Sequence, residues 1–186
     1  MRIIGGRLKG REVEAPRGVL SRPPLSIIRE SVFNILGQSL EGKRVLDLFA
    51  GSGSLGIEAI SRGAAEVQFV DSARRCAQMI ERNTGGLGIG AVCRIARQDA
   101  AEFVRGSKDS PFDLVFVDPP FLSGKAEEVL GALAVSGLVS DATVTIVRTH
   151  WRERINLPPE LQITRQRKFG DSIVAFVKRK QRGTGE

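Results

Sequence analysis

The clearest chemical signal in the chain is a glycine-rich segment that follows a short apolar run. Gly51, Gly53 and Gly56 satisfy the spacing G-x-G-x-x-G, directly after an expected strand and at the start of an expected helix. Glycines in that setting allow a tight turn and a close backbone approach to a nucleotide-like ligand. Asp71 ends the next expected strand, where a carboxylate can accept both hydroxyls of a ribose. Taken alone, the glycines fit a dinucleotide cofactor and also a plain strand–helix turn.

A carboxylate inside the preceding strand changes the expected ligand. Asp47 stands where a dinucleotide-binding strand usually has small or apolar residues. It would repel a pyrophosphate and attract a cation, which favours S-adenosylmethionine, a cofactor with a sulfonium, an amino group and no phosphate. Asp99 is placed to accept from an adenine amino group, to cap the helix that starts at Ala100, or to do both. The predicted cofactor-binding residues are Asp47, Phe49, Ala50, Gly51, Ser52, Gly53, Gly56, Asp71, Asp99 and Ala100.

The tetrapeptide D-P-P-F at 118–121 follows an apolar strand and is the candidate catalytic motif. Ligands of doubly wound sheets bind outside the carboxyl ends of the strands, so the tetrapeptide and the glycine segment should face one crevice. Pro119 and Pro120 fix the backbone and donate no hydrogen bond, which leaves carbonyl acceptors beside the Asp118 carboxylate. Phe121 adds an aromatic face. Together these four residues suit a planar base that stacks on Phe121 and donates its exocyclic amine to Asp118 and the Pro119 carbonyl.

The charge of the chain is distributed unevenly. Residues 1–30 carry seven Arg or Lys against three Glu, and residues 148–186 carry ten against four acidic residues. The middle, 31–147, has 11 basic and 14 acidic residues. Basic ends around a mildly acidic middle indicate an anionic partner, most simply a nucleic acid, and a small-molecule site in between.

Length and composition exclude several other classes of protein. A chain of 186 residues is long enough for one α/β domain with a short extension, and 41% hydrophobic residues are typical of a globular protein. It contains no apolar run of the ~20 residues that a membrane-spanning helix needs, and its start lacks a signal-peptide pattern. Two cysteines without a C-x-x-C motif and a single histidine predict no metal site and no disulfide. The expected location is the reducing cytoplasm.

The pattern along the chain predicts a parallel sheet covered by helices on both faces. Short apolar strands are expected at 44–49, 66–71, 91–95, 112–118 and 143–148, with helices near 54–62, 73–83, 99–105 and 125–134. Such alternation is typical of a doubly wound α/β domain. An antiparallel pair at 161–168 and 172–177 would complete a Rossmann-like sheet of seven strands. We expect a cofactor-binding domain at 40–186, preceded by a small basic extension at 1–39 that holds a hairpin or arm and one helix.

With both motifs placed, the chain resembles the RsmD-type family of S-adenosylmethionine-dependent methyltransferases. The resemblance spans nearly the whole chain. It rests on R-I-I-G-G-R-L-K-G-R at 2–11, R-E-S-V-F-N-I-L at 29–36, the glycine segment within 45–63, D-P-P-F at 118–121 and K-F-G at 168–170. The opening R-I-I-G-G coupled to L-D-L-F-A-G-S-G is specific to this family, whereas D-P-P-F occurs in many amino-methyltransferases.

The resemblance implies the class I methyltransferase fold and methylation of the exocyclic N2 amine of a guanine in 16S ribosomal RNA. The implied catalytic residues are Asp118, Pro119, Pro120 and Phe121. The implied partner is ribosomal RNA, the small ribosomal subunit or an assembly intermediate, bound by a monomer. The residues expected to hold RNA phosphates are Arg2, Arg7, Lys9, Arg11, Arg22, Arg29 and Lys168.

One segment departs from the family pattern, and three other functions fit part of the sequence. Family members usually read R-P-T-T-D-R-V-R-E where this chain has R-P-P-L-S-I-I-R-E at 22–30, which changes polar residues expected near the substrate. A DNA adenine-N6 methyltransferase shares the D-P-P-F chemistry but usually has a separate target-recognition region. An NAD-dependent oxidoreductase fits the glycines but neither Asp47 nor D-P-P-F. A non-catalytic RNA-binding protein would need the basic ends without a complete cofactor pocket.

Overall fold

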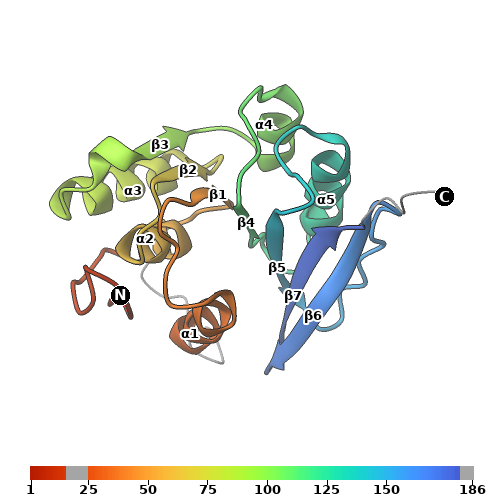
Figure 1. The fold of residues 1–186 in the computed structure, drawn as a ribbon, viewed down its shortest axis with the longest axis horizontal. Coiled ribbons are helices and arrows are strands. Elements are labelled where there is room, and N and C mark those ends of the chain that lie inside the picture. The colour runs from red at the N-terminus through yellow and green to blue at the C-terminus, as the bar shows by residue number, and fades with distance from the viewer. Residues whose placement is uncertain (16–24, 181–186) are drawn as a thin grey trace.

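Seven strands form one mixed sheet with helices on both faces (Figure 1). The computed structural model describes residues 1–15 and 25–180. The strand order is β3-β2-β1-β4-β5-β7-β6, and β7 runs antiparallel to both of its neighbours while the other pairs are parallel. The strands are β1 (Arg44–Leu48), β2 (Glu66–Val70), β3 (Cys93–Ala96), β4 (Leu114–Val117), β5 (Val144–His150), β6 (Leu161–Phe169) and β7 (Ser172–Arg179). The helices are α1 (Leu25–Leu36), α2 (Ser54–Ser61), α3 (Arg74–Gly86), α4 (Ala100–Gly106) and α5 (Lys125–Val135), with a 3-10 turn at Gly90–Val92.

Successive residues of a strand point to opposite faces of the sheet and belong to two separate apolar clusters. Val45 packs with residues of α1, α2 and α3 on one face, and Leu46 packs with residues of α4 and α5 on the other. Both residues are fully buried. Burial on both faces explains why the central strands are nearly continuous apolar runs instead of alternating polar and apolar residues.

The architecture confirms the predicted Rossmann-like α/β fold, and the differences lie at the ends of elements. β4 is shorter than the predicted 112–118 because the Phe112 N–H donates to the Leu138 carbonyl, outside the sheet. β6 runs one residue further than predicted, to Phe169, which pairs with Ser172 across a turn at Gly170. Gly170 has a φ of 55°, a conformation that glycine adopts without strain.

The N-terminal segment packs against the sheet domain and shares its core. Ile3 and Val13 are buried in the same apolar cluster as Val45. Residues on both sides of position 39 thus share one hydrophobic core. The division of the chain there remains a prediction about the separate roles of the extension and the cofactor-binding domain. Within the described residues, none of the helices is long and apolar enough to cross a membrane.

Candidate active site

The glycine segment joins β1 to α2 in a conformation that glycine favours. Gly51 and Gly53 have φ angles of 58° and 78°, in the left-handed region that other residues seldom adopt. A Cβ on Gly56 would overlap the ring of Phe69, so the third glycine allows α2 to pack directly against β2. The predicted tight strand–helix connection is confirmed.

Asp47 lies beneath this segment and is almost completely buried, with 1% of its surface exposed. Its Oδ2 accepts a 2.9 Å hydrogen bond from the Gly56 N–H in the first turn of α2. Burial raises the pKa of Asp47 well above its usual value; the Gly56 N–H opposes this shift, and the charges of Asp118 and Asp71 add to it. The Gly56 N–H at this helix start, where a pyrophosphate would bind, thus faces the Asp47 carboxylate. The site fits a cationic ligand such as S-adenosylmethionine and disfavours a dinucleotide.

Asp71 and Asp99 both use their carboxylates to fix loops at the same edge of the sheet. Asp71 accepts from the N–H groups of Gly51 and Ala73, each at 2.9 Å. Asp99 caps α4 by accepting from the Ala101 N–H at 2.9 Å, and its Oδ2 lies 3.1 Å from Lys125 Nζ. The capping role of Asp99 is confirmed. The contacts of Asp71 with a ribose and of Asp99 with an adenine remain predictions.

The other predicted cofactor residues hold the backbone of this edge in place. The Ala50 N–H donates to the Val70 carbonyl at 3.1 Å, and the Ser52 carbonyl accepts from Asn83 Nδ2 at 3.0 Å. Phe49 has a φ of 61° although it is not glycine, and Ala100 is the buried first residue of α4. Their place beside Asp47 and Asp71 is compatible with cofactor binding, which remains a prediction for each side chain.

The D-P-P-F tetrapeptide lies next to the glycine segment because β1 and β4 are neighbours in the sheet. Leu48 pairs with Val117 at the ends of the two strands, and the Asp118 N–H approaches the Leu48 carbonyl at 3.5 Å. Leu122, directly after the tetrapeptide, has a φ of 58°. It and Phe49 are the two non-glycine residues of the described chain in the left-handed region, so strained backbone follows each motif strand. The two motifs therefore lie at neighbouring strand ends, as expected, and a common crevice between them remains a prediction.

Arg148, from the end of β5, contacts both the acid and the aromatic ring of the tetrapeptide. Its Nε donates to Asp118 Oδ1 at 2.6 Å, and its guanidinium lies 4.7 Å from the centre of the Phe121 ring. Burial raises the pKa of Asp118, while the charge and hydrogen bond of Arg148 oppose the rise. Among the described residues, Arg148 is the side chain that binds this carboxylate through Oδ1, which leaves Oδ2 to accept from an amine.

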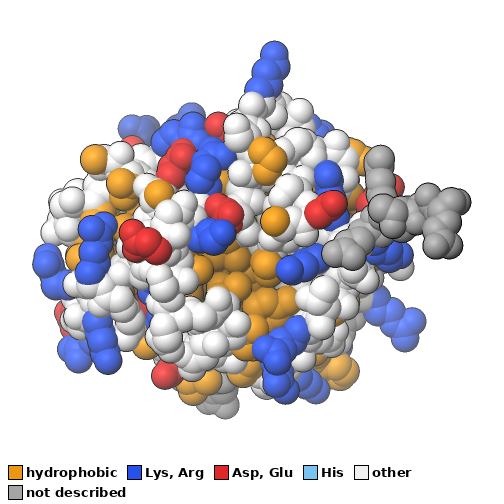
Figure 2. Space-filling view, in the orientation of Figure 1, with side chains coloured by type: hydrophobic (Ala, Val, Ile, Leu, Met, Phe, Trp, Pro, Cys, Tyr) orange, Lys and Arg blue, Asp and Glu red, His pale blue; other side chains and the backbone are white. Residues whose placement is uncertain are grey.

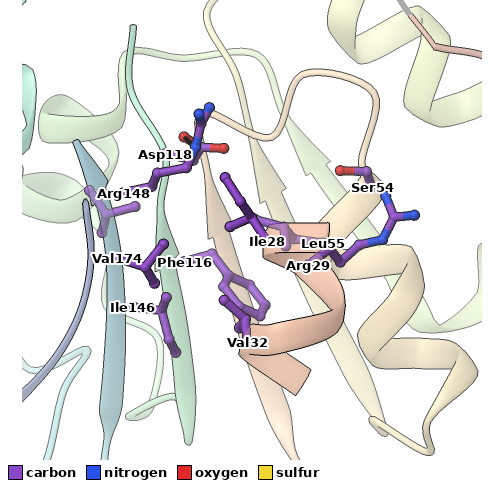
Figure 3. A pocket seen from close by; sticks show the side chains of 11 residues that line it. Ile28, Arg29, Val32, Ser54, Leu55, Phe116, Asp118, Ile146, Arg148 and Val174 are labelled. Carbon is purple, nitrogen blue, oxygen red and sulfur yellow. Dashed lines mark hydrogen bonds and ion pairs between the residues drawn. The ribbon is translucent and has the colours of Figure 1, made fainter. Parts of the chain in front are cut away.

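An apolar pocket of about 50 Å³ opens beside Asp118 and Arg148, between α1 and the sheet (Figure 3). Its walls include Ile28, Phe116 and Val174. Figure 2 shows hydrophobic side chains in a hollow near the middle of one face, with Lys and Arg side chains around it. The apolar walls keep water from one side of the Asp118 carboxylate, which is the physical cause of its raised pKa.

The basic residues predicted to bind RNA lie in separate places. Arg2, Arg7, Lys9 and Arg11 are exposed on the N-terminal segment. The Arg7 N–H donates to the carbonyl of Ser61, the last residue of α2, so this turn lies about 12 Å along the helix from the glycine segment. Lys168 is exposed on β6, with its Nζ 5.0 Å from the centre of the Trp151 ring. Arg22 is outside the described residues. Phosphate contacts of the exposed side chains remain predictions.

The prediction that Arg29 holds a phosphate is wrong, because the side chain is buried. Only 3% of its surface is exposed, and its Nη2 donates to the Arg2 carbonyl at 2.8 Å. Its Nε lies 3.6 Å from Glu58 Oε2, a carboxylate that also binds Arg62 Nε at 2.9 Å. Glu58 in turn accepts from the N–H groups of Ile4 and Gly5. Arg29 therefore belongs to a buried ion cluster that fastens the N-terminal segment to α2.

Sequence reasoning missed Arg148 and the Glu58 cluster. A signal for Arg148 existed, since it is a lone cation at the carboxyl end of an apolar strand, the edge at which Asp118 was placed. Glu58 and Arg62 are four residues apart on a helix, which is the spacing of an ordinary surface ion pair. Nothing in that spacing distinguishes a buried pair from an exposed one.

Sequence matches to known proteins extend over the chain from end to end. The family model described as Conserved hypothetical protein 95 matches residues 1–178. Ribosomal RNA small subunit methyltransferase D of Escherichia coli K12 is 32% identical over 187 residues, covering 100% of this chain and 93% of that protein. The protein of the same name from Haemophilus influenzae is 29% identical and covers 95% of this chain and 91% of its own length.

Solved structures agree with this relationship. The structure of yhhF from Escherichia coli has a TM-score of 0.85 and 31% identity, and the match covers 98% of this chain and 99% of that one. HI0767 from Haemophilus influenzae has a TM-score of 0.82 and 27% identity, with 97% and 98% covered. The glycine segment and D-P-P-F lie at adjoining strand ends, and the family model matches nearly the full length of the chain. This chain therefore belongs to the RsmD family of methyltransferases.

Proposed function

We propose that this chain transfers a methyl group from S-adenosylmethionine to the exocyclic N2 amine of a guanine in 16S ribosomal RNA. The substrate is the free RNA or a small-subunit particle, and the protein acts as a monomer in the cytoplasm. Membership of the RsmD family supports the reaction, and the names of the relatives support the RNA. The observation that carries the proposal is the place of Asp118, beside the glycine segment and with one carboxylate oxygen turned to Arg148.

The acidic edge of the sheet supports the choice of cofactor. Asp71 and Asp118 lie close enough to Asp47 for their charges to raise its pKa. Three carboxylates in one neighbourhood favour a ligand with positive charge, and S-adenosylmethionine supplies an electrophilic methyl group when bound. In this proposal Asp71 accepts from the ribose, Asp47 stabilises the cationic end through the loop above it, and Asp99 accepts from the adenine while it caps α4.

Asp118 and its neighbours activate the amine mainly by holding it in place. The lone pair of a guanine amine is delocalised into the ring, which makes the nitrogen a poor nucleophile. Hydrogen bonds from the amine to Asp118 Oδ2 and the Pro119 carbonyl return electron density to nitrogen and orient its lone pair. Positioning two reactants in line contributes roughly 7–11 kcal/mol. The product amine is strongly acidic while cationic, and its proton leaves to Asp118 Oδ2 or to water.

The target base must leave its stack to reach this crevice. Extruding a base costs a few kcal/mol, and less when the base is already unpaired. Phe121, which is 38% exposed, offers a ring on which the extruded base can stack. An unpaired guanine in a loop of the RNA is therefore the expected target.

Transfer of a radiolabelled methyl group tests the proposal directly. Naked 16S rRNA, assembled small subunits and duplex DNA are incubated in parallel with the protein and labelled S-adenosylmethionine, and the modified nucleotide is mapped. We expect label on N2 of one guanine in RNA or in the particle. Label on adenine N6 in DNA would replace the proposal with the DNA methyltransferase alternative, and the absence of label from every substrate would leave only an RNA-binding role.

A further inference from the structure

We infer that the turn at His150 and Trp151, together with Lys168 and Arg152, is a stacking platform for an unpaired nucleotide next to the target guanine. The inference rests on the proposed function, because it names where the RNA strand lies as it leaves the site. It assigns a substrate-binding role to Trp151, an exposed aromatic residue that the methyl-transfer reaction itself does not use.

A continuous row of rings connects the catalytic tetrapeptide to this turn. The Phe121 and His150 rings have centroids 5.5 Å apart in an edge-to-face arrangement, and the His150 and Trp151 rings are 5.9 Å apart at 31°. These separations lie within the range of favourable aromatic contacts. A strand whose target base stacks on Phe121 thus has a further aromatic surface beside it.

Cations accompany the rings along this row. Arg152 and Lys168 lie 4.8 Å and 5.0 Å from the centre of the Trp151 ring, and Arg148 lies 4.7 Å from that of Phe121. An exposed ring flanked by Lys and Arg is the combination that binds single-stranded nucleic acid, since the base stacks on the ring while the cations hold the phosphates. Arg165 and Arg167, exposed on β6, extend the positive charge beyond Lys168.

The turn is held rigidly although its ring is open to solvent. Trp151 is 45% exposed and belongs to neither apolar cluster, yet its N–H donates to the Asp171 carbonyl at 2.9 Å. The Glu153 N–H donates to the His150 carbonyl at 2.9 Å, and Glu153 Oε2 accepts from the Leu122 N–H at 3.0 Å. The Glu153 carboxylate thereby ties the turn to the residue that follows D-P-P-F. A turn whose backbone is fixed in this way loses little entropy when its ring binds a base.

Fluorescence can detect this contact without any labelling, because Trp151 is the single tryptophan and the chain has no tyrosine. The full-length protein is titrated with a short single-stranded oligo-adenylate and with the same strand paired to its complement. Filter binding measures the bound fraction independently. We expect the single strand to quench Trp151 and to protect it from iodide, and the duplex to do neither at equal occupancy. Bound single strand without any change in Trp151 emission or iodide access would overturn the inference.

Substitutions separate stacking from general charge. Trp151→Ala should raise the dissociation constant for single-stranded RNA by about 5- to 150-fold, the range of one base–aromatic stack, while Trp151→Phe keeps most of the affinity. Val135→Ala, at an apolar residue that is 82% exposed on α5, is the matched control and should change nothing. Lys168→Ala should weaken binding more than Arg105→Ala, an exposed cation on α4 paired with Glu128. Wild-type RNA affinity in Trp151→Ala would contradict the platform.

The outcome for the platform is distinguishable from the outcome for the proposed function. In an active enzyme, Trp151→Ala should raise the KM for RNA and leave both S-adenosylmethionine affinity and the single-turnover rate at saturating RNA unchanged. A wild-type protein that methylates no RNA would refute the function, whatever the fluorescence shows. An active wild type whose KM for RNA is the same in Trp151→Ala would refute the platform alone.

Discussion

Arg148 Nε donates to Asp118 Oδ1 across 2.6 Å, linking the ends of two neighbouring parallel strands, β5 and β4. About a fifth of each side chain is exposed (19% for Arg148 and 22% for Asp118). Arg148 opposes the rise that burial causes in the pKa of Asp118, and its hydrogen bond engages one carboxylate oxygen and leaves the other free of this contact. If Asp118 is catalytic as proposed, we expect Arg148 to act as its positioning residue.

Removing the Arg148 charge should move the acid limb of the pH profile. Arg148 lowers the pKa of Asp118 against the effect of burial, so Arg148→Gln leaves burial unopposed and the pKa rises. If the single-turnover rate depends on ionised Asp118, as proposed, it should begin to fall at a higher pH in the variant. Arg148→Lys keeps the charge and should retain most of the wild-type profile. An acid limb at the same pH in wild type and Arg148→Gln would contradict the role given to this pair.

Cofactor binding should release a proton from Asp47. Burial raises the pKa of this carboxyl, and a cationic ligand nearby should lower it again, so S-adenosylmethionine should bind more weakly as the pH falls through the raised value. Calorimetric titration in two buffers of different ionisation enthalpy measures the released proton. Asp47→Asn keeps an acceptor for the Gly56 N–H and should abolish the release while the thermal stability at neutral pH does not fall. Equal proton release in the variant would exclude Asp47 as its source.

The buried Glu58 cluster should contribute strongly to stability. Glu58→Ala leaves Arg29 and Arg62 as uncompensated buried cations. It also removes the hydrogen-bond acceptor of the backbone N–H groups of Ile4 and Gly5. We expect a loss of about 3–5 kcal/mol in the free energy of unfolding by urea denaturation. Glu128→Ala breaks the exposed pair with Arg105 and serves as the control, with a loss of about 0–1 kcal/mol. Equal losses of unfolding free energy in the two variants would contradict the stabilising role of the Glu58 cluster.

The exposed N-terminal cations should act on RNA without affecting the cofactor. Deleting the segment is a poor test because Ile3 and Val13 belong to the core, so Arg7 and Lys9 should be replaced by Ala instead. If each contacts one phosphate, the log–log slope of RNA affinity against salt should flatten by about 0.7–0.9 per residue. S-adenosylmethionine affinity should stay constant. A wild-type slope in the double variant would show that these charges do not touch the RNA.

The parts of the molecule governed by local rules could be predicted from the sequence. Short apolar runs predicted all seven strands, and the glycine spacing predicted the tight turn between β1 and α2. The cap at Asp99 follows from a rule that spans three residues. D-P-P-F was placed beside the glycines because ligands in such sheets bind at the carboxyl ends of the strands.

Features that depend on tertiary packing could not be predicted in the same way. Arg29 looks like other basic residues of the N-terminal region, and only the packing of α1 against the sheet buries it beside Glu58. The approach of Lys168 to Trp151 depends on the register of β6, β7 and β5. Strand periodicity predicts that such strands exist, but it does not predict which residues of an added antiparallel pair lie side by side.

Single-turnover methyl transfer by Asp118→Ala, at saturating S-adenosylmethionine and RNA, tests the central claim most directly. Asp113→Ala, at the other end of the same strand region, is the matched control. We predict a fall of about a hundredfold or more in the Asp118→Ala rate, an intermediate fall in Asp118→Asn, and unchanged cofactor affinity in both. A wild-type rate in Asp118→Ala would contradict the account and leave Asp118 as a residue of the strand end without a catalytic role.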